Sequence, residues 1–559
     1  MKTNLTFRIS FLMTIVMLLW NPAQAQFESY FGVFDGSEDM ADTRILANGH
    51  TIVLANTTSY GPQKILLAEL SETGEVLWYR TIQDAVDSDM ELTGKSIELA
   101  LDSSGVHIGY FITGCRGNYL SQLTVIRTDL TGTPGWNLTL YNTERRDTLE
   151  ECGVSLERQG NGDIIVVGTS ANYSTGNNRF IAARLSLYGE IRWCYRYGSV
   201  QGLQFYPNES CNGLRNSVPV IAIVGHVHEN GQGHTFVSCI QAGSGLEVWR
   251  RRYDSNGFHD DGNDIVQNPS NQRFRVVGQI DSLGGSSGMW VFNANVLNGT
   301  LIDGSAYRFA GGSLVATDVT LGFPTSSAMI VGRRDSASVG PLAFAMRLPF
   351  AAGAIPVWSY NYGYSSPNVL GDDAVDRSTS VPGSYVLGSV AVEGYLYVAA
   401  IGAGGDPLCS GVPFESTVTP TGHSESLNKH RSSSNVWIQN VLQAEDQEFV
   451  QFLCWPAGTE FGQQRMEETP TDLVASIFPN PIYAGDLIHV QVDLPEASEV
   501  SIQLLDSNNR SHGNWREYRE AGTQDFTMRI PSASFPQVYF VRITLSDGQQ
   551  KIIKVVANS

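Results

Sequence analysis

The sequence has little charge, and after its first twenty residues it has no long apolar run. Only 16% of the 559 residues are Asp, Glu, Lys or Arg, while Gly accounts for 56 of them. Helical proteins usually carry more Glu, Lys and Ala, so this composition favours an all-β chain with many turns. Since no later stretch reaches about twenty apolar residues, we expect no transmembrane segment in the mature chain.

Motifs of several large enzyme classes are also missing. The sequence contains no P-loop, no zinc-protease helix, no dinucleotide-binding fingerprint and no sialidase-like Asp box. Its seven cysteines form no Cys-x-x-Cys pair, which argues against thiol redox chemistry and zinc ribbons. We therefore identify no catalytic, cofactor-binding or metal-binding residue and expect no cofactor. Whether the chain is an enzyme stays open, with the balance toward a non-enzyme.

The chain is acidic, with a formal net charge of −20 at pH 7. A surface of this sign repels phosphate backbones, so we expect no nucleic-acid partner. The more ordinary interpretation of the charge is that it maintains solubility.

The first 25 residues have the three parts of a signal peptide. Lys2 and Arg8 form a positive start, residues 9–20 are nearly all apolar, and Ala23-Gln24-Ala25 is a small-x-small cleavage site. The apolar run of about a dozen residues is too short to span a bilayer. The sequence therefore predicts export, with residues 1–25 removed and the cysteines in an oxidising compartment.

A unit of about 55 residues recurs along the chain and predicts a β-propeller. A Gly closes the second strand of six units, at spacings of 53 to 57 residues: Gly114, Gly168, Gly225, Gly278, Gly332 and Gly388. An earlier unit, residues 51–55, has Ala in that place. A Trp marks the fourth strand of five units: Trp78, Trp136, Trp193, Trp249 and Trp358. Small residues suit crowded strands near an axis, and large rings suit the wider space farther out.

Seven such units give an all-β fold with a seven-bladed β-propeller over residues 26–408, followed by a small C-terminal β-sandwich. The last unit lacks a fourth strand that begins near Trp. Residues 27–32 end in Tyr-Phe-Gly, which matches the fourth-strand endings Tyr-Arg-Tyr-Gly at 195–198 and Tyr-Asn-Tyr-Gly at 360–363. We therefore expect them to complete the last blade. Such pairing would remove the edges that an open ring exposes.

The positions of the cysteines on the predicted blades suggest three disulfides. Cys115 and Cys152 fall on the same rim of neighbouring blades, and Cys194 lies shortly before Cys211. Cys409 and Cys454 bracket residues 409–455, a segment after the last blade. Cys239 is left over and is predicted to be a small buried apolar residue. Sequence alone does not fix the connectivity.

The C-terminal region begins with a polar linker, residues 456–471, and continues as a separate domain, residues 472–559. Its alternating strands are expected at 487–492, 500–505, 538–543 and 551–556, a β-sandwich pattern. The alternative is a plain accessory sandwich such as a fibronectin-like module.

The motifs of this domain resemble the type A C-terminal sorting domain of type IX (Por) secretion. They are the opening Phe478-Pro479-Asn480-Pro481, the turn at 506–510, and the last two strands. Gln537 departs from the family, which usually has Gly there. The resemblance implies the type IX secretion machinery as a partner and passage through the periplasm and outer membrane. It also implies removal of the domain, and a protein that is secreted or attached to the outer cell surface.

Two groups of polar residues are candidate functional sites. Acidic residues recur before first strands: Glu38, Asp39 and Asp42; Asp260, Asp261 and Asp264; Asp372, Asp373 and Asp376. Such a ring could hold Ca²⁺ or protonate a sugar, but recurrence in separate blades favours capping of turn amides. His226, His228 and His234 could form a metal site, although an exposed strand end and loop is the favoured interpretation.

These features leave two functions open. The favoured one is a surface-displayed binding or interaction module for an unknown glycan or protein ligand. The alternative is a secreted hydrolase or lyase acting on glycans or peptides at one mouth of the propeller. Fold alone does not decide, because propellers host both.

Overall fold

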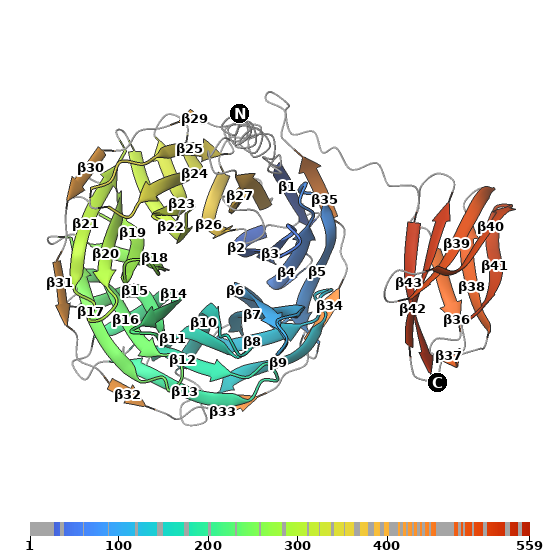
Figure 1. The fold of residues 1–559 in the computed structure, drawn as a ribbon, viewed down its shortest axis with the longest axis horizontal. Coiled ribbons are helices and arrows are strands. Elements are labelled where there is room, and N and C mark those ends of the chain that lie inside the picture. The colour runs from blue at the N-terminus through green and yellow to red at the C-terminus, as the bar shows by residue number, and fades with distance from the viewer. Residues whose placement is uncertain are drawn as a thin grey trace, which may run out of the picture. The chain divides into compact units, whose positions relative to one another are not determined.

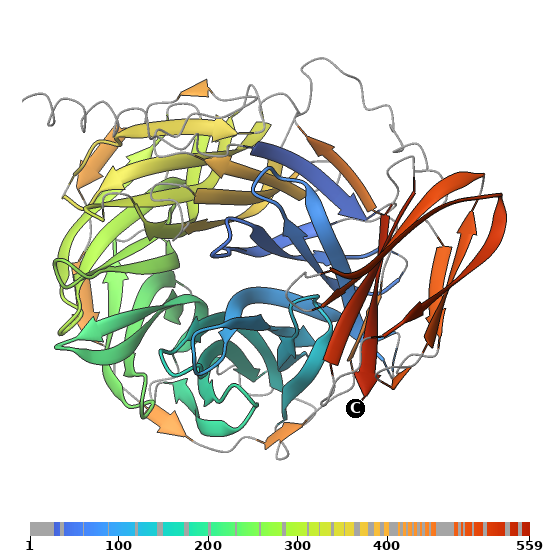
Figure 2. The same ribbon diagram turned by 45° about the vertical axis from the view of Figure 1, so that its right-hand side comes forward.

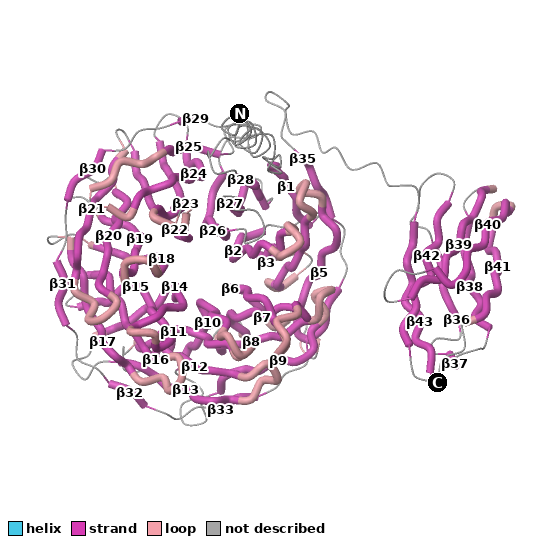
Figure 3. Tube along the Cα trace, viewed as in Figure 1, coloured by secondary structure: helices cyan, strands magenta, loops and turns pink. Residues whose placement is uncertain are grey.

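A computed structural model describes residues 27–453 and 474–558, apart from short stretches such as 142–148, 363–368, 378–384 and 402–411. The predicted signal peptide and the predicted linker lie outside the described residues. Every regular element that the model describes is a β-strand, which confirms the all-β prediction (Figure 3). The chain divides into two compact units, residues 1–460 and 461–559.

The first unit contains seven five-stranded sheets that follow one another around a central space (Figure 1). Six of them use four consecutive antiparallel strands. Sheets 1 to 3 contain β2 (Glu38–Ile45), β3 (Thr51–Thr57), β4 (Lys64–Leu70), β5 (Val76–Asp84); β6 (Leu92–Leu101), β7 (His107–Arg116), β8 (Gln122–Thr128), β9 (Pro134–Tyr141); and β10 (Leu149–Arg158), β11 (Ile164–Asn172), β12 (Arg179–Leu185), β13 (Ile191–Gly198).

Sheets 4 to 6 repeat this arrangement. They contain β14 (Gln204–Arg215), β15 (Val218–Glu229), β16 (Gln232–Gln241), β17 (Glu247–Asp254); β18 (Asp260–Asn268), β19 (Arg273–Ile280), β20 (Gly288–Asn295), β21 (Leu301–Arg308); and β22 (Gly312–Leu321), β23 (Ser327–Ser336), β24 (Gly340–Pro349), β25 (Trp358–Tyr362). The repeated four-strand pattern is consistent with a propeller.

Sheet 7 takes its strands from both ends of the unit. It contains β26 (Val369–Arg377), β27 (Tyr385–Ala391), β28 (Leu396–Ile401) and β1 (Phe27–Val33). Strand β1 pairs antiparallel with β28, with Tyr30 opposite Tyr397, as the sequence predicts. Seven buried apolar clusters are each shared by two neighbouring sheets, and one of them joins sheet 7 to sheet 1 through Leu396 and Met40.

The fifth strand of each sheet comes from one segment, residues 412–453, which we name the belt. Its strands pair in turn with sheets 6, 5, 4, 3, 2, 1 and 7: β29 (Val412–Pro413), β30 (Thr417–Pro420), β31 (His423–Ser426), β32 (His430–Ser432), β33 (Val436–Ile438), β34 (Leu442–Glu445) and β35 (Phe449–Leu453). Figure 2 shows several of these short strands along the outer edges of the sheets. The belt thus covers strand edges that would otherwise offer unpaired main-chain groups.

The fourth-strand tryptophans seal the outer part of the gap between sheets. Trp249 donates its Nε1–H to Val296 O at 2.9 Å, in the turn between the third and fourth strands of the next sheet. Gly299 of that turn has φ of 69°, and an added Cβ would lie 2.5 Å from the Trp249 ring. The turn therefore needs Gly both for its conformation and for its contact with the ring.

The second unit is a pair of sheets that share one core. The smaller sheet contains β36 (Val474–Phe478), β38 (Leu487–Leu494) and β41 (Gly522–Arg529), and the larger contains β37 (Ile482–Tyr483), β43 (Gln550–Asn558), β42 (Gln537–Leu545), β39 (Ser498–Asp506) and β40 (Ser511–Arg519). Alternate apolar residues of β38, β39, β41 and β42 form the core. The four strands expected from the sequence are present as β38, β39, β42 and β43, and β36, β37, β40 and β41 are additional.

Candidate functional site

The first strand of each sheet lies next to the central space, and six of these inner strands carry a β-bulge at the same level. Each bulge places one extra residue between two register positions: Ala41, Lys95, Val154, Asn208, Asn263 and Thr317. The inner strand of sheet 7, β26, has a register shift between Leu370 and Ala374. Because a bulge re-aims side chains, it can direct an extra residue out of the sheet.

The recurring second-strand glycines explain how the bulges fit. Gly225 and Gly278 lie opposite the bulges of their sheets. A Cβ at these positions would come within 2.0 Å of Tyr206 O and 1.9 Å of Asp261 O. Glycine at these positions therefore allows the close approach of the inner strand's carbonyl.

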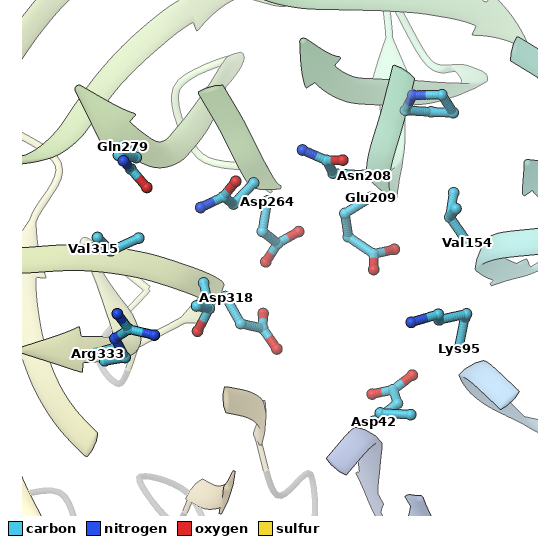
Figure 4. A pocket seen from close by; sticks show the side chains of 14 residues that line it. Asp42, Lys95, Val154, Asn208, Glu209, Asp264, Gln279, Val315, Asp318 and Arg333 are labelled. Atoms are coloured by element: carbon cyan, nitrogen blue, oxygen red, sulfur yellow. The ribbon is translucent and has the colours of Figure 1, made fainter. Parts of the chain in front are cut away.

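A cavity of about 580 Å³ lies among the inner strands. All six bulge residues line it, together with four acidic side chains, Asp42, Glu209, Asp264 and Asp318. Each of these acids directly follows a bulge residue. Figure 4 shows their carboxyl groups and the Lys95 ammonium group directed toward the same space.

Two of these acids link neighbouring inner strands. Asp42 Oδ2 accepts hydrogen bonds from Ile97 N at 2.9 Å and from Ser96 Oγ at 3.1 Å, both in the next sheet. Asp264 Oδ2 accepts one from Val319 N at 2.6 Å in the same way. Each acid also accepts the N–H of the residue that follows it. These side chains therefore replace the main-chain pairing that neighbouring sheets lack.

The amides at the bulges make the converse bond. Asn208 Nδ2 donates to Gly262 O at 2.8 Å, and Asn263 Nδ2 donates to Ala316 O at 2.6 Å. In both pairs the carbonyl belongs to the residue before the bulge of the next inner strand. Acids and amides together form a series of side-chain to main-chain links around the cavity.

Burial changes the protonation of the cavity acids. Desolvation raises the pKa of Asp42 to about 6, against the lowering effect of Arg44. It raises the pKa of Glu209 to about 8, although a hydrogen bond from Ser155 opposes the shift. Desolvation and the neighbouring Asp318 carboxylate raise the pKa of Asp264 well above its ordinary value. At neutral pH, Glu209 therefore holds a proton and Asp42 is mostly ionised, while the upward pKa shift of Asp264 favours its protonated form.

Only some residues of the predicted acidic clusters line this cavity. Asp42 and Asp264 line it, but they accept N–H groups of neighbouring inner strands rather than of turns. The side chains of Asp372, Asp373 and Asp376 lie outside the described residues. Glu209 and Asp318 were missed because each is a single acid without acidic neighbours in sequence. Their shared place after an inner-strand bulge is the signal that would have found them.

The histidines weighed as one metal site lie on two faces of sheet 4. Val227 is the register partner of His234 across β15 and β16, so His234 lies on the face opposite to His226 and His228. The ring centroids of His226 and His228 are 5.0 Å apart, and His226 Nδ1 is 3.8 Å from Asp261 Oδ1. A site made of all three histidines is therefore wrong, because alternate residues of a strand point to opposite faces.

The cysteine predictions have mixed outcomes. Cys115 and Cys152 form the predicted disulfide between sheets 2 and 3, with Cα atoms 4.6 Å apart. Cys194 and Cys211 keep their thiols, so the predicted bond between them is wrong. Cys194 packs against the cluster between sheets 2 and 3, and Cys211 against the one between sheets 4 and 5.

The other cysteines lie as follows. Cys239 is fully buried in the cluster between sheets 4 and 5, as expected of a small apolar residue. Cys409 and Cys454 lie outside the described residues, so their pairing stays a prediction. Phe478 of the sorting motif ends β36, whereas Pro479, Asn480 and Pro481 lie outside the described residues.

Among the described residues, no helix is long and apolar enough to cross a membrane. No family model and no curated protein matches the chain. Among solved structures, it is similar to PorZ, an essential bacterial surface component of the type-IX secretion system of Porphyromonas gingivalis, with 10% identity and a TM-score of 0.33. That match covers 93% of this chain and 59% of PorZ, so this chain spans about three-fifths of PorZ.

A fungal alcohol oxidase of the AA5 family, solved in complex with copper, is also similar. Its identity is 10%, its TM-score is 0.28, and the match covers 83% of this chain and 97% of the oxidase. At these TM-scores neither likeness carries an argument about activity, metal or partner.

Proposed function

We propose that this chain is a secreted or outer-surface binding protein. In this proposal the seven sheets form a closed seven-bladed propeller that binds an external glycan in its central cavity. The C-terminal unit is an export address for type IX secretion and takes no part in ligand binding. The observation that carries the binding function is the polar cavity of about 580 Å³ into which every described inner-strand bulge sends a residue.

The chemistry of the cavity favours a glycan. A neutral carboxyl group, as at Glu209, both donates and accepts hydrogen bonds, which suits sugar hydroxyl groups. The raised pKa of Asp264 favours the same form there. Lys95 makes no ion pair in the part of the chain that the structure describes, so its ammonium group has capacity for a ligand oxygen. Proteins and peptides bind more often through exposed apolar anchors, and apolar side chains are a minority at this cavity.

A glycan microarray probed with the mature chain tests the binding function. We expect a defined set of glycans to bind, and Lys95→Ala to weaken that binding by about tenfold, the effect of losing one charged hydrogen bond. Arg192→Ala is the matched control, since Arg192 is half exposed on β13 and does not line the cavity. Absence of glycan binding, or equal binding by Lys95→Ala, would contradict the proposal.

One observation favours the alternative of a glycan hydrolase. Burial and the neighbouring Asp318 raise the pKa of Asp264, and glycoside hydrolysis uses a carboxyl group with a raised pKa together with a second carboxylate. Both Asp264 oxygens already accept main-chain N–H groups, however, and this favours binding without cleavage. Release of reducing ends from a bound glycan by the native chain, abolished in Asp318→Asn, would establish the hydrolase instead.

The export function is supported by the signal-peptide pattern and by the resemblance of the last strands to the sorting family. Deletion of residues 472–559 in the native host tests it. We expect the truncated protein to accumulate in the periplasm with its first unit folded, because the two units form separate compact bodies. Normal appearance of the truncated protein at the surface or in the medium would overturn the sorting role.

A further inference from the structure

A second polar cluster lies at the edge of sheet 4, outside the central cavity. It consists of His234 of β16, Asp254 at the end of β17, and Asp260 at the start of β18. A ring nitrogen of the histidine and one oxygen of each carboxylate all lie within 4.8 Å of one another. The three residues are 5%, 8% and 0% exposed, so the cluster is withdrawn from water.

The hydrogen bonds inside this cluster are incomplete. His234 Nδ1 is buried and makes no hydrogen bond to the described residues, although Asp254 Oδ2 is only 3.2 Å away. Asp260 Oδ2 accepts from Ser255 N at 2.7 Å, and its Oδ1 accepts from Ser255 Oγ. A buried imidazole nitrogen without a hydrogen bond is costly unless something else satisfies it.

The charged groups beside the cluster make contacts of their own. Arg252 forms an ion pair with Glu229. Asp261, next to Asp260 in the sequence, lies 3.8 Å from both His226 and His259.

We propose that His234, Asp254 and Asp260 bind one divalent transition-metal ion of the zinc class. One imidazole nitrogen with two carboxylate oxygens is a donor set that such ions accept, and Ca²⁺ or Mg²⁺ would prefer oxygen alone. The ion would bind one oxygen of each carboxylate and the His234 nitrogen that lacks a hydrogen bond. Three protein ligands leave one position of a tetrahedral site for water or for a ligand from outside.

The position of the site determines its consequence for the fold. Asp254 ends the last strand of sheet 4 before the belt, and Asp260 begins the inner strand of sheet 5. An ion shared by both would tie the outer end of one sheet to the inner start of the next. None of the three ligands lines the central cavity, so this site is independent of the proposed glycan binding.

Metal analysis of the intact mature chain tests the inference. The chain is stripped with a chelator, reloaded with Zn²⁺, dialysed, and measured by elemental analysis and thermal unfolding. We expect one zinc per chain and a rise in the melting temperature of several degrees. With Co²⁺ as the probe, a visible ligand-field spectrum of low coordination number should develop. A chain that retains no zinc after reloading would overturn the inference.

Substitution of the ligands tests whether the metal binds to them. His234→Ala and Asp260→Asn should each lose the zinc and the thermal shift while the zinc-free proteins keep the circular dichroism of the native β-fold. The matched control is the double variant His226→Ala/His228→Ala, which removes two imidazoles of the same sheet from its other face and should keep the zinc. Loss of zinc in this control and its retention in His234→Ala would overturn the assignment. If His234→Ala fails to fold, His234→Gln with the Co²⁺ spectrum decides the question.

Discussion

The inner and outer edges of the seven sheets come from the same repeated unit, yet they are held together differently. At the inner edge, short polar side chains bond to the main chain of the next sheet, as Asp42 does to Ile97 N. At the outer edge, rings such as Trp249 fill the gap against a neighbouring turn, and the belt adds a fifth strand. Near the centre, where the gap between neighbouring sheets is narrow, single side-chain hydrogen bonds join them. Farther out, where the gap is wide, large aromatic rings and the added belt strands fill it.

Removal of the belt should give the largest effect, because it affects the outer edge of all seven sheets. A chain that stops at residue 411 loses β29–β35 and exposes seven strand edges. We expect aggregation and loss of a cooperative thermal transition, since unpaired edges template association. Size-exclusion chromatography and calorimetry measure both.

The matched control stops at residue 460 and keeps the belt while it lacks the second unit. Both truncated chains carry Cys409→Ser, so the predicted Cys409–Cys454 pairing does not differ between them. If the chain ending at 411 melts like the control, the belt is a passive covering and the outer edge depends on its rings alone.

The ring contribution at the outer edge is tested by Trp249→Ala. The side chain is 6% exposed and fills the space between sheets 4 and 5. Its removal should lower the free energy of unfolding by about 3–5 kcal/mol, the usual cost of truncating a buried aromatic. Tyr188→Ala, at a residue 81% exposed, should cost less than about 0.5 kcal/mol. Denaturant unfolding measures both.

The contact of Trp249 with Gly299 can be isolated by a double-mutant cycle. Gly299→Ala places a Cβ against the ring in a turn with φ of 69°, so it should destabilise the native protein. In a Trp249→Ala background the steric part of that cost should vanish and leave about 1 kcal/mol for the backbone conformation. Additive effects would show that the glycine is needed for its conformation alone.

The outer edge was also the part of the fold that sequence could predict. The tryptophans of this edge recur at a regular spacing, as do the second-strand glycines nearer the centre, because each sheet meets the same packing demand. The pairing of β1 with β28 followed from an ending shared with other fourth strands. The belt was missed because strands of two to five residues have too few positions to show a hydrophobic period.

The cavity was predictable only in part, for a different reason. Its acids owe their place to the bulge, and a bulge is one extra residue without a fixed sequence signature. Asp42 and Asp264 were noticed because other acids precede them, whereas Glu209 and Asp318 stand alone. The histidines show the opposite limit, because proximity in sequence left one shared metal site open as the less favoured alternative, and the strand register places His234 on the other face.

Loss of the disulfide near the inner edge should lower the free energy of unfolding by less than loss of a buried ring. Cys115–Cys152 closes a segment of 37 residues between β7 and β10. Replacement of both cysteines by Ser should lower the free energy of unfolding by about 2–4 kcal/mol, mainly through a less constrained unfolded chain. The double Ser variant should still fold, because the inner strands of sheets 2 and 3 keep their apolar contacts. Reduction of the native protein should produce the same shift in the melting temperature as the double variant.

The smallest expected effect is the pH dependence that the cavity acids impose. Because the pKa of Glu209 is raised from 4.5 to about 8, the folded protein holds a proton that the unfolded chain releases between these values. Unfolding then releases protons, so stability should fall as pH rises from about 4.5 through about 8.

Glu209→Gln keeps an oxygen that accepts from Ser155 Oγ and Ser210 N but removes the titration. Near pH 5 the variant should match the native protein. Near pH 8.5 it should be more stable by about 1–3 kcal/mol, since each pKa unit corresponds to about 1.4 kcal/mol and exposure at the cavity reduces the full value. Asp42, whose pKa is raised to about 6, contributes its own pH dependence of stability at lower pH in both proteins.

Parallel stability curves of the two proteins across this range would mean that water or a ligand solvates Glu209 as fully in the folded state as in the unfolded chain. The inner edge would then be an open, hydrated channel, and its polar links would differ from the outer edge in geometry but not in burial.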